Sequence, residues 1–144
     1  MNTTNMIVRI MTISDYEKVY ALWQNTPNMG LNDIDDSREG IAKYLDRNPR
    51  TSFVAEVDGK IVGVILSGNG GRRGYIHHTA VAQNMQKHGI GTALVNAAMD
   101  ALSTEGIQKC ALVCFAKNTQ GNDFWEKRGF SVRGDLMYRN KYTK

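Results

Sequence analysis

The chain has 144 residues and a net charge of +4, from 18 Lys and Arg against 14 Asp and Glu. This length suits a single domain over residues 1–144 that buries a core without disulfides or a metal, and no metal is expected. Because no apolar run of roughly 18 residues occurs and residues 1–11 do not resemble a signal peptide, the sequence predicts no membrane contact and a cytoplasmic location.

The first predicted elements surround a polar loop. In chain order they are a strand at 8–11, a helix at 14–23, a loop at 25–36 and a helix at 37–47. Ser14, with Glu17 three residues later, predicts a capping box at the start of the first helix. The second helix is expected to end before an Asn-Pro pair, because the residue before proline disfavours the helical conformation.

The middle of the chain predicts three strands. They are expected at 53–57, 61–66 and 75–81. Asp58-Gly59-Lys60 between the first two is typical of a hairpin turn. Residues 68–74, rich in glycine and arginine, are predicted to be a loop before the third strand.

The remaining elements complete the fold. A helix is expected at 90–105, a buried strand at 110–116, a short helix at 121–128, and strands at 130–132 and 137–142. The two cysteines, Cys110 and Cys114, fall in an apolar segment and are expected to be reduced. The element order predicts an α/β fold (α+β by some schemes) with a mixed, mostly antiparallel sheet and helices on both faces.

A glycine-rich loop, Gln-Lys-His-Gly-Ile-Gly-Thr at 86–92, links the third of these strands to the long helix. Backbone N–H groups at a helix start are unpaired and lie at the positive end of the helix dipole. Gly89 and Gly91 have no Cβ, so an anion can approach the backbone closely. The loop is interpreted as a phosphate cradle. The excess positive charge of residues 73–144, with 10 Lys and Arg against 5 Asp and Glu, agrees with a polyanionic ligand.

The spacing of the glycines narrows the choice of phosphate-bearing ligand. A dinucleotide fold would need a third glycine where Leu94 stands, and the Gly-Lys-Ser/Thr ending of a nucleoside-triphosphate loop is missing. Gln-x-x-Gly-x-Gly at 86–91 resembles the pyrophosphate-binding loop of the GCN5-related N-acetyltransferases (GNAT family). A second motif, Asn118 followed by Phe-Trp-Glu-Lys-Arg-Gly-Phe at 124–130, resembles that family's Asn…Phe-Tyr-Glu-Lys-x-Gly-Phe.

The resemblance covers nearly the whole chain. It is strongest to an uncharacterised bacterial group in which Gly-x-x-Gly-Arg-Arg-Gly, here 68–74, precedes the strand. It implies the acyl-CoA N-acyltransferase fold and acetyl-CoA as co-substrate. The cofactor-binding residues that it implies are Thr79, Ala80, Val81, Gln86, Lys87, His88, Gly89, Ile90, Gly91, Thr92, Asn118, Gly121, Phe124 and Trp125.

For the catalytic groups the sequence gives several candidates. The resemblance implies that the N–H of Val81 is the donor to the thioester oxygen. His77 and His78 are candidate bases because imidazole titrates near neutral pH, and Glu56 is a rival carboxylate. The two histidines alternate along a strand, so only one can face the cleft unless a bulge shifts the pattern.

One position departs from the family pattern. Trp125 stands where the family usually has its acidic Tyr, and an indole N–H cannot give up a proton near neutral pH. Either the thiolate leaves unprotonated or takes a proton from water, or another residue such as Tyr138 or Tyr75 substitutes. Packing against the cofactor is the alternative role of Trp125.

The sequence therefore predicts an acetyl-CoA-dependent N-acetyltransferase that acts directly on a primary amine of a small molecule or peptide. The acceptor is not identified, since Arg72 and Arg73 suit either an acidic group of the acceptor or a solvated loop. The resemblance leaves a homodimer open. Alternatives are a non-catalytic CoA-binding sensor and a basic nucleic-acid-binding module. The second is disfavoured, and no nucleic-acid partner is expected, because no stripe of basic and aromatic residues occurs.

Overall fold

The computed structural model describes residues 5–144, which form two compact units. The first unit ends at Val113 and the second is Cys114–Lys144. Each unit is described by itself below. No helix in the described part of the chain is long and apolar enough to cross a membrane. That residues 1–144 act as one domain stays a prediction.

The first unit is built on a five-stranded sheet with the order β1-β2-β3-β4-β5. The strands are β1 (Met6–Ile10), β2 (Phe53–Val57), β3 (Lys60–Asn69), β4 (Gly74–Val81) and β5 (Cys110–Leu112). Neighbouring strands are antiparallel except β4 and β5, which are parallel. The predicted mixed, mostly antiparallel sheet is confirmed.

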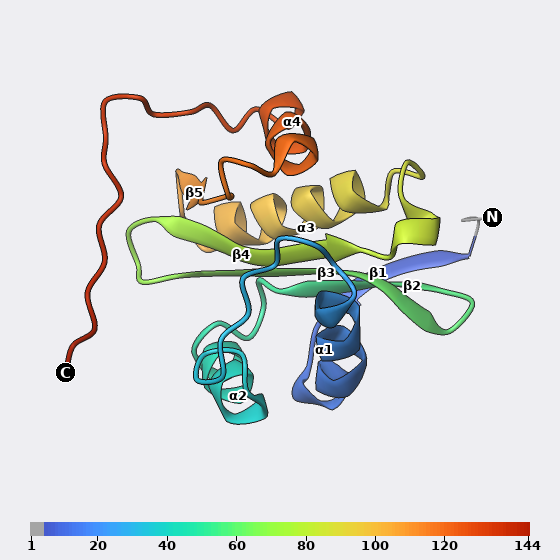
Figure 1. Ribbon diagram of the computed structural model, residues 1–144. Helices are drawn as coiled ribbons and strands as arrows, with labels where there is room; N and C mark the ends of the chain where they lie inside the picture. Colours follow the sequence, from blue (N-terminus) through green and yellow to red (C-terminus); the bar gives the residue numbers. More distant parts are fainter. Residues whose placement is uncertain (1–4) are drawn as a thin grey trace. The chain divides into compact units, whose positions relative to one another are not determined.

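Helices cover both faces of this sheet. The longest, α3 (Ile90–Thr104), packs on one face, and α1 (Tyr16–Gln24) and α2 (Arg38–Arg47) lie on the other (Figure 1). Apolar residues at helical spacing explain the packing of α3, since five of them are buried: Ile90, Leu94, Val95, Ala98 and Leu102. The core on the opposite face includes Trp23 of α1, Leu45 of α2 and Ala80 of β4.

Local turn chemistry explains two junctions. Asp58 and Gly59 both have positive φ, 52° and 78°, as a two-residue hairpin between β2 and β3 requires. Ser37 caps α2, because its Oγ accepts the N–H of Gly40 at 3.0 Å. Both predictions from sequence, the hairpin and the second helix, are confirmed.

The start of the first helix differs from the prediction. A short 3-10 turn, η1 (Ile13–Asp15), precedes α1, and the capping carboxylate is Asp15, which accepts the N–H of Thr12 at 2.9 Å. The predicted capping box of Ser14 and Glu17 is wrong, because Glu17 instead pairs with Arg38 of α2. The capping residue is Thr12, two residues earlier than expected, and Asp15 also forms an ion pair with Arg9 of β1.

The second unit contains α4 (Thr119–Lys127), preceded by its cap Asn118. The strands predicted at 130–132 and 137–142 are wrong: residues 130–144 form no strand, and the predicted 110–116 strand ends at Leu112. A strand needs partner hydrogen bonds and a buried face. Apolar side chains in this tail are exposed instead, including Val132 at 82% and Met137 at 81%.

Candidate functional site

The loop between β4 and α3 has the backbone geometry of an anion cradle. Lys87 and Gly89 both adopt the left-handed conformation, with φ of 67° and 81°. Left-handed residues alternating with others turn successive N–H groups toward one concavity. The N–H groups of Gly89, Ile90 and Gly91 follow at the start of α3, where no acceptor exists within the helix.

A side chain at the Gly89 position would project into open space. A Cβ built there meets no atom within 4 Å. The backbone of Gly89 is therefore approachable, and its left-handed φ favours glycine for a second reason. Both features fit the phosphates of a nucleotide cofactor.

The cradle is anchored to the sheet on its β4 side. After β4 the chain forms a 3-10 turn, η2 (Gln83–Met85), whose Met85 is buried at 1% exposure. The Nε2 of Gln86 donates to the carbonyl of Val81 at 3.3 Å. The Gln86 amide thus ties the loop to the strand end, a role that the sequence analysis did not foresee.

The other predicted cradle residues differ in how far their side chains are exposed. Lys87 and His88 are exposed, so their side chains are accessible to a ligand. Ile90 is buried, so only its N–H can contribute. Thr92 lies in the first turn of α3 and is half-buried.

Strand β4 continues beyond the end of its pairing with β5, so within the described part of the chain its last residues have no strand on that side. The parallel pairing with β5 covers only Gly74–Ile76. Ala82 donates its N–H to the Val62 carbonyl of the β3 side at 2.8 Å. Because alternate residues of an antiparallel strand point their backbone groups to the same side, the N–H groups of Thr79 and Val81 point to the edge that β5 has left.

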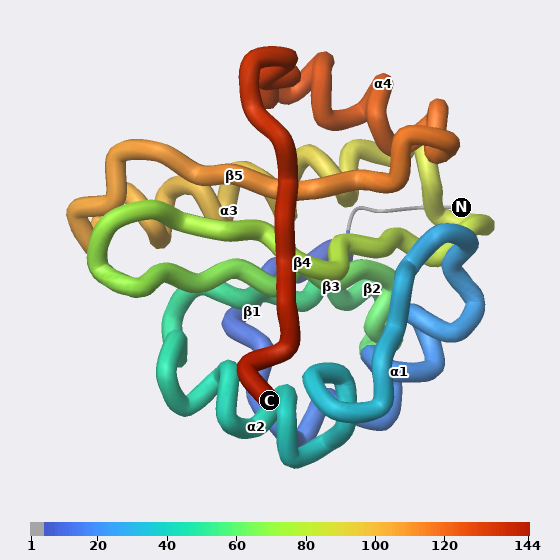
Figure 2. The backbone as a smooth tube through the Cα atoms, turned by 60° about the vertical axis from the view of Figure 1, so that its left-hand side comes forward, coloured from blue at the N-terminus to red at the C-terminus, as the bar shows by residue number. Residues whose placement is uncertain are grey.

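This open edge leads directly into the cradle. The Cα trace passes from β4 through η2 into α3 without an intervening element (Figure 2). Ala80 turns its side chain into the core on the α1 and α2 face. The structure therefore brings the predicted residues 79–81 and 86–92 together as one continuous stretch.

A bulge in β4 changes how the two histidines face. His77 and His78 together lie opposite the single β3 residue Leu66, because the register shifts there. In a regular strand the two rings would lie on opposite faces. Here both contact residues of the face that α1 and α2 cover: the His77 ring meets Tyr44, and the His78 ring meets Trp23. The exception stated from sequence, a bulge that shifts the alternation, is present here.

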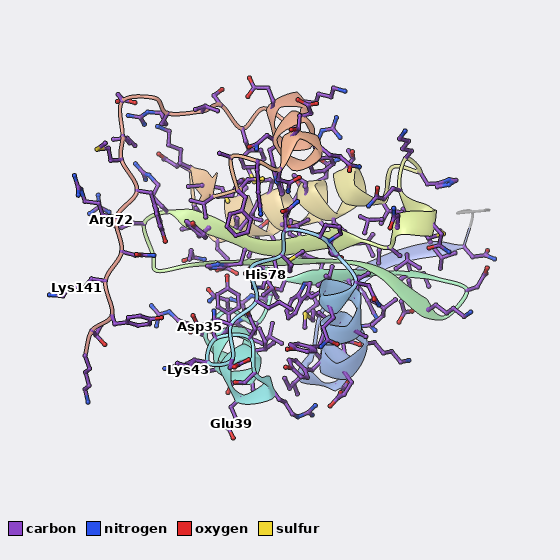
Figure 3. The ribbon with its side chains drawn as sticks, viewed as in Figure 1. Asp35, Glu39, Lys43, Arg72, His78 and Lys141 are labelled. Carbon is purple, nitrogen blue, oxygen red and sulfur yellow. The ribbon has the colours of Figure 1, made fainter. Side chains whose placement is uncertain are left out.

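The His78 ring pairs with a buried carboxylate. Its Nε2 lies 2.9 Å from Oδ1 of Asp36, whose side chain is only 5% exposed. Trp23 packs edge-on against the same ring, with centroids 5.2 Å apart. Figure 3 shows His78 on β4 and Asp35, the neighbour of Asp36, on the loop that leads into α2.

The Asp36 carboxylate is held in its charged form. Burial would raise its pKa, but hydrogen bonds from the His78 ring and from the N–H of Asn32, the latter at 2.9 Å, lower the pKa below the ordinary value. Asp36 was not among the candidates from sequence. An Asp-Asp-Ser run before a helix is typical of a cap, so nothing local distinguished it.

The His77 ring lies between two tyrosines. Its centroid is 5.3 Å from that of Tyr44 and 4.6 Å from that of Tyr75. Desolvation by the surrounding protein lowers the pKa of His77, and the neighbouring His78 lowers it further, although the residue as a whole is exposed. The environment of His77 thus disfavours its charged form.

Glu56 lies on β2, which β3 separates from β4, and it belongs to an ion-pair network there. Arg9 of β1 donates from Nη2 to Glu56 at 2.8 Å and also to Asp15 at 2.8 Å. Hydrogen bonds to these carboxylates raise the pKa of Arg9, first from Asp15 and then from Glu56. The carboxylate of Glu56 is therefore engaged in an ion pair with Arg9.

The predicted residues of the second unit have structural contacts of their own. The Asn118 side chain accepts the N–H of Gly121 at 2.9 Å and caps α4. Phe124 and Phe130 pack against Trp125, with centroids 5.0 and 5.3 Å away. The roles of Asn118, Gly121, Phe124 and Trp125 toward a cofactor stay predictions.

The remaining candidates lie on exposed or apolar segments. Arg72 and Arg73 are exposed on the loop between β3 and β4 (Figure 3 labels Arg72). Cys110 and Cys114 are free, and burial raises the pKa of the Cys110 thiol to about 11. Within residues 5–144 no group of three His, Cys, Asp or Glu side chains is arranged to hold a metal ion.

Known proteins resemble this chain over most of its length. The model of the acetyltransferase (GNAT) family matches residues 16–130. An acetyltransferase of Yersinia enterocolitica is 27% identical over 132 residues, 92% of each chain. Two solved structures share the fold. Ard1 from Thermoplasma volcanium is 21% identical, with a TM-score of 0.81 over 90% of this chain and 85% of that one. The PaiA N-acetyltransferase from Thermoplasma acidophilum, in complex with coenzyme A, is 19% identical, with a TM-score of 0.77 over 89% of this chain and 91% of that one.

Proposed function

The chain belongs to the acetyltransferase (GNAT) family and is an acetyltransferase, and we propose that it moves the acetyl group of acetyl-CoA directly to a primary amine of a small molecule or peptide. The predicted family and α/β fold are confirmed. The amine acceptor and the direct route are our inference from the site.

The observation that carries the proposal is the cradle joined to the open edge of β4. The left-handed Lys87 and Gly89 and the first N–H groups of α3 suit the pyrophosphate of the co-substrate. The outward N–H groups of Thr79 and Val81 suit an extended amide-bearing arm, which would add to β4 as a further strand does. The Val81 N–H is then the donor to the thioester oxygen.

Direct transfer is supported by the state of the thiols. A covalent acetyl-cysteine route needs a thiolate, and burial raises the pKa of Cys110 to about 11 and also raises that of Cys114. Both thiols are therefore less ionised near neutral pH than a free cysteine. Direct attack by the amine of the acceptor is the route that we propose.

The experiment compares two glycine variants by calorimetric titration with CoA. In Gly89→Val a branched side chain is added where a phosphate would approach the Gly89 backbone, so we expect CoA affinity to fall at least about tenfold. Gly106→Val is the matched control: Gly106 lies just beyond the other end of α3, has the same φ of 81°, and its Cβ also meets nothing within 4 Å. Backbone strain is therefore shared, and only the cradle differs.

Two outcomes would overturn the assignment. CoA affinity unchanged in folded Gly89→Val would show that the cradle does not bind the pyrophosphate. An equal loss in Gly106→Val would show that strain, not the cradle, weakens binding. A screen of amines for thiol release then tests catalysis, and tight CoA binding with no release for any amine would favour the CoA-binding sensor.

A further inference from the structure

We propose that His78 is the base that takes the proton from the acceptor amine and that Asp36 is the residue that positions it. This inference rests on the proposed function, since it concerns the acceptor side of the same site. The observation behind it is the 2.9 Å contact between Nε2 of His78 and Oδ1 of Asp36. This contact connects β4 to the loop before α2.

The contact determines which nitrogen of His78 is basic. An ionised carboxylate only accepts hydrogen bonds, and Asp36 is held in its charged form by its neighbours. The Nε2 of His78 must therefore carry the hydrogen and donate it. The lone pair of the neutral ring is then on Nδ1, which is left to accept a proton.

The surroundings hold the ring in one orientation. Trp23 packs edge-on against it, and the His78 side chain is 19% exposed, which leaves it accessible. The loop carboxylate is itself anchored: the Asn32 N–H donates to its Oδ2, and the Tyr16 hydroxyl donates to the Asp36 carbonyl at 2.6 Å. The pair is thus preorganised by α1, β4 and the loop.

The other titratable groups near the pair do not compete for this role. On β4, His77 has its pKa lowered by desolvation and by its like neighbour, so it accepts a proton less readily. On the loop, Asp35 is exposed and bonds to Asn32. Glu56 is engaged by Arg9.

The position along β4 links the pair to the reacting carbonyl. His78 is the second residue of the bulge, and it is followed by Thr79, whose N–H points to the open edge. The Val81 N–H, the proposed oxyanion donor, points to the same edge. The bulge therefore places the ring beside the stretch where the thioester would lie.

The step balances as follows. The acceptor arrives as an ammonium ion and transfers one proton to Nδ1 of His78. The freed nitrogen lone pair attacks the thioester carbon, forming the C–N bond, and the C–S bond breaks with its electron pair going to sulfur. The second nitrogen proton passes to the thiolate, giving amide and CoA thiol, and His78 returns its proton to water.

The test is a double-mutant cycle on kcat with the best amine found, measured across pH 6 to 10. We expect His78→Gln to lower kcat on the order of 100-fold at neutral pH, with a defect that shrinks as pH rises and the amine deprotonates by itself. Asp36→Asn is expected to lower kcat about tenfold, because the ring is no longer held in the tautomer that leaves the lone pair on Nδ1. In the double variant Asp36→Asn should add almost nothing to His78→Gln, since the two act as a unit.

Matched controls separate this role from a structural one. Asp35→Asn removes an adjacent exposed carboxylate and should leave kcat within about twofold. CoA titration of every variant should show unchanged affinity. A loss from Asp36→Asn that is as large in the His78→Gln background as alone would overturn the pairing, and so would a full rate in His78→Gln at neutral pH. If the parent protein releases no thiol with any amine, the proposed function fails instead.

Discussion

At the scale of single residues, two tyrosines on the face that carries His77 and His78 differ in whether their hydroxyl groups have a hydrogen-bond partner. The Tyr16 hydroxyl is satisfied by the Asp36 carbonyl. The Tyr44 hydroxyl is buried with no hydrogen-bond partner among the described residues, and burial raises its pKa. A buried unsatisfied hydroxyl costs stability, whereas a satisfied one contributes to it.

We therefore expect two Tyr→Phe changes to have opposite effects. Tyr44→Phe should leave the free energy of unfolding unchanged or raise it by up to about 1 kcal/mol, because it removes an unsatisfied group. Tyr16→Phe should lower it by about 1 kcal/mol, because it orphans a loop carbonyl. Urea unfolding measures both. A loss from Tyr44→Phe as large as that from Tyr16→Phe would mean that the Tyr44 hydroxyl has a partner.

At the scale of elements, the loop before α2 is held close to that helix by a glycine. A Cβ at Gly40 would lie 2.4 Å from the carbonyl oxygens of both Ile34 and Asp35. These are backbone atoms, so the loop itself would have to move. The position of Asp36, and hence its contact with His78, depends on this close approach.

Gly40→Ala should consequently weaken both fold and activity. We expect a loss of about 1–3 kcal/mol in unfolding free energy from overpacking, and a fall in kcat while CoA affinity stays unchanged. Gly70→Ala is the control, because a Cβ there meets nothing within 4 Å and its φ is not in the left-handed region. Equal stability of the two variants in thermal unfolding would contradict the predicted close approach.

At the scale of the whole molecule, the dependence of stability on pH follows from two buried carboxylates, Asp15 and Asp36, that are ionised in the folded protein. The Arg9 hydrogen bond lowers the pKa of Asp15, and Asp36 also has a lowered pKa. A carboxyl with a lower pKa when folded than when unfolded stabilises the protein above its unfolded pKa, here 3.8. That stabilisation is lost as pH falls below this value through the folded pKa.

The expected result is a stability that is level near neutral pH and falls below about pH 4. Asp15→Asn should lower the unfolding free energy at pH 7 by about 1–3 kcal/mol and make the acid decline less steep. Asp100→Asn, which removes an exposed carboxylate of α3, is the comparison. Urea unfolding at a series of pH values measures the slopes, and an acid decline as steep in Asp15→Asn as in the parent would contradict the assignment.

The sequence by itself determined what depends on neighbours along the chain. The glycines of the 86–92 loop, the apolar spacing of α3 and the Asp-Gly hairpin are local signals, and the loop, helix and hairpin that they predicted are present. Local turn chemistry and side-chain periodicity act over a few residues, so they can be predicted without knowing the fold.

The tertiary structure decided what depends on distant partners. The Asp36–His78 contact joins residues 42 positions apart, the Arg9–Glu56 pair joins residues 47 apart, and the bulge at His77 and His78 follows from β3 register. The apolar residues after 130 predicted strands from sequence but have no partner strand in the described structure. Pairing and burial depend on which segments meet in space, and the side-chain pattern of one segment does not contain that information.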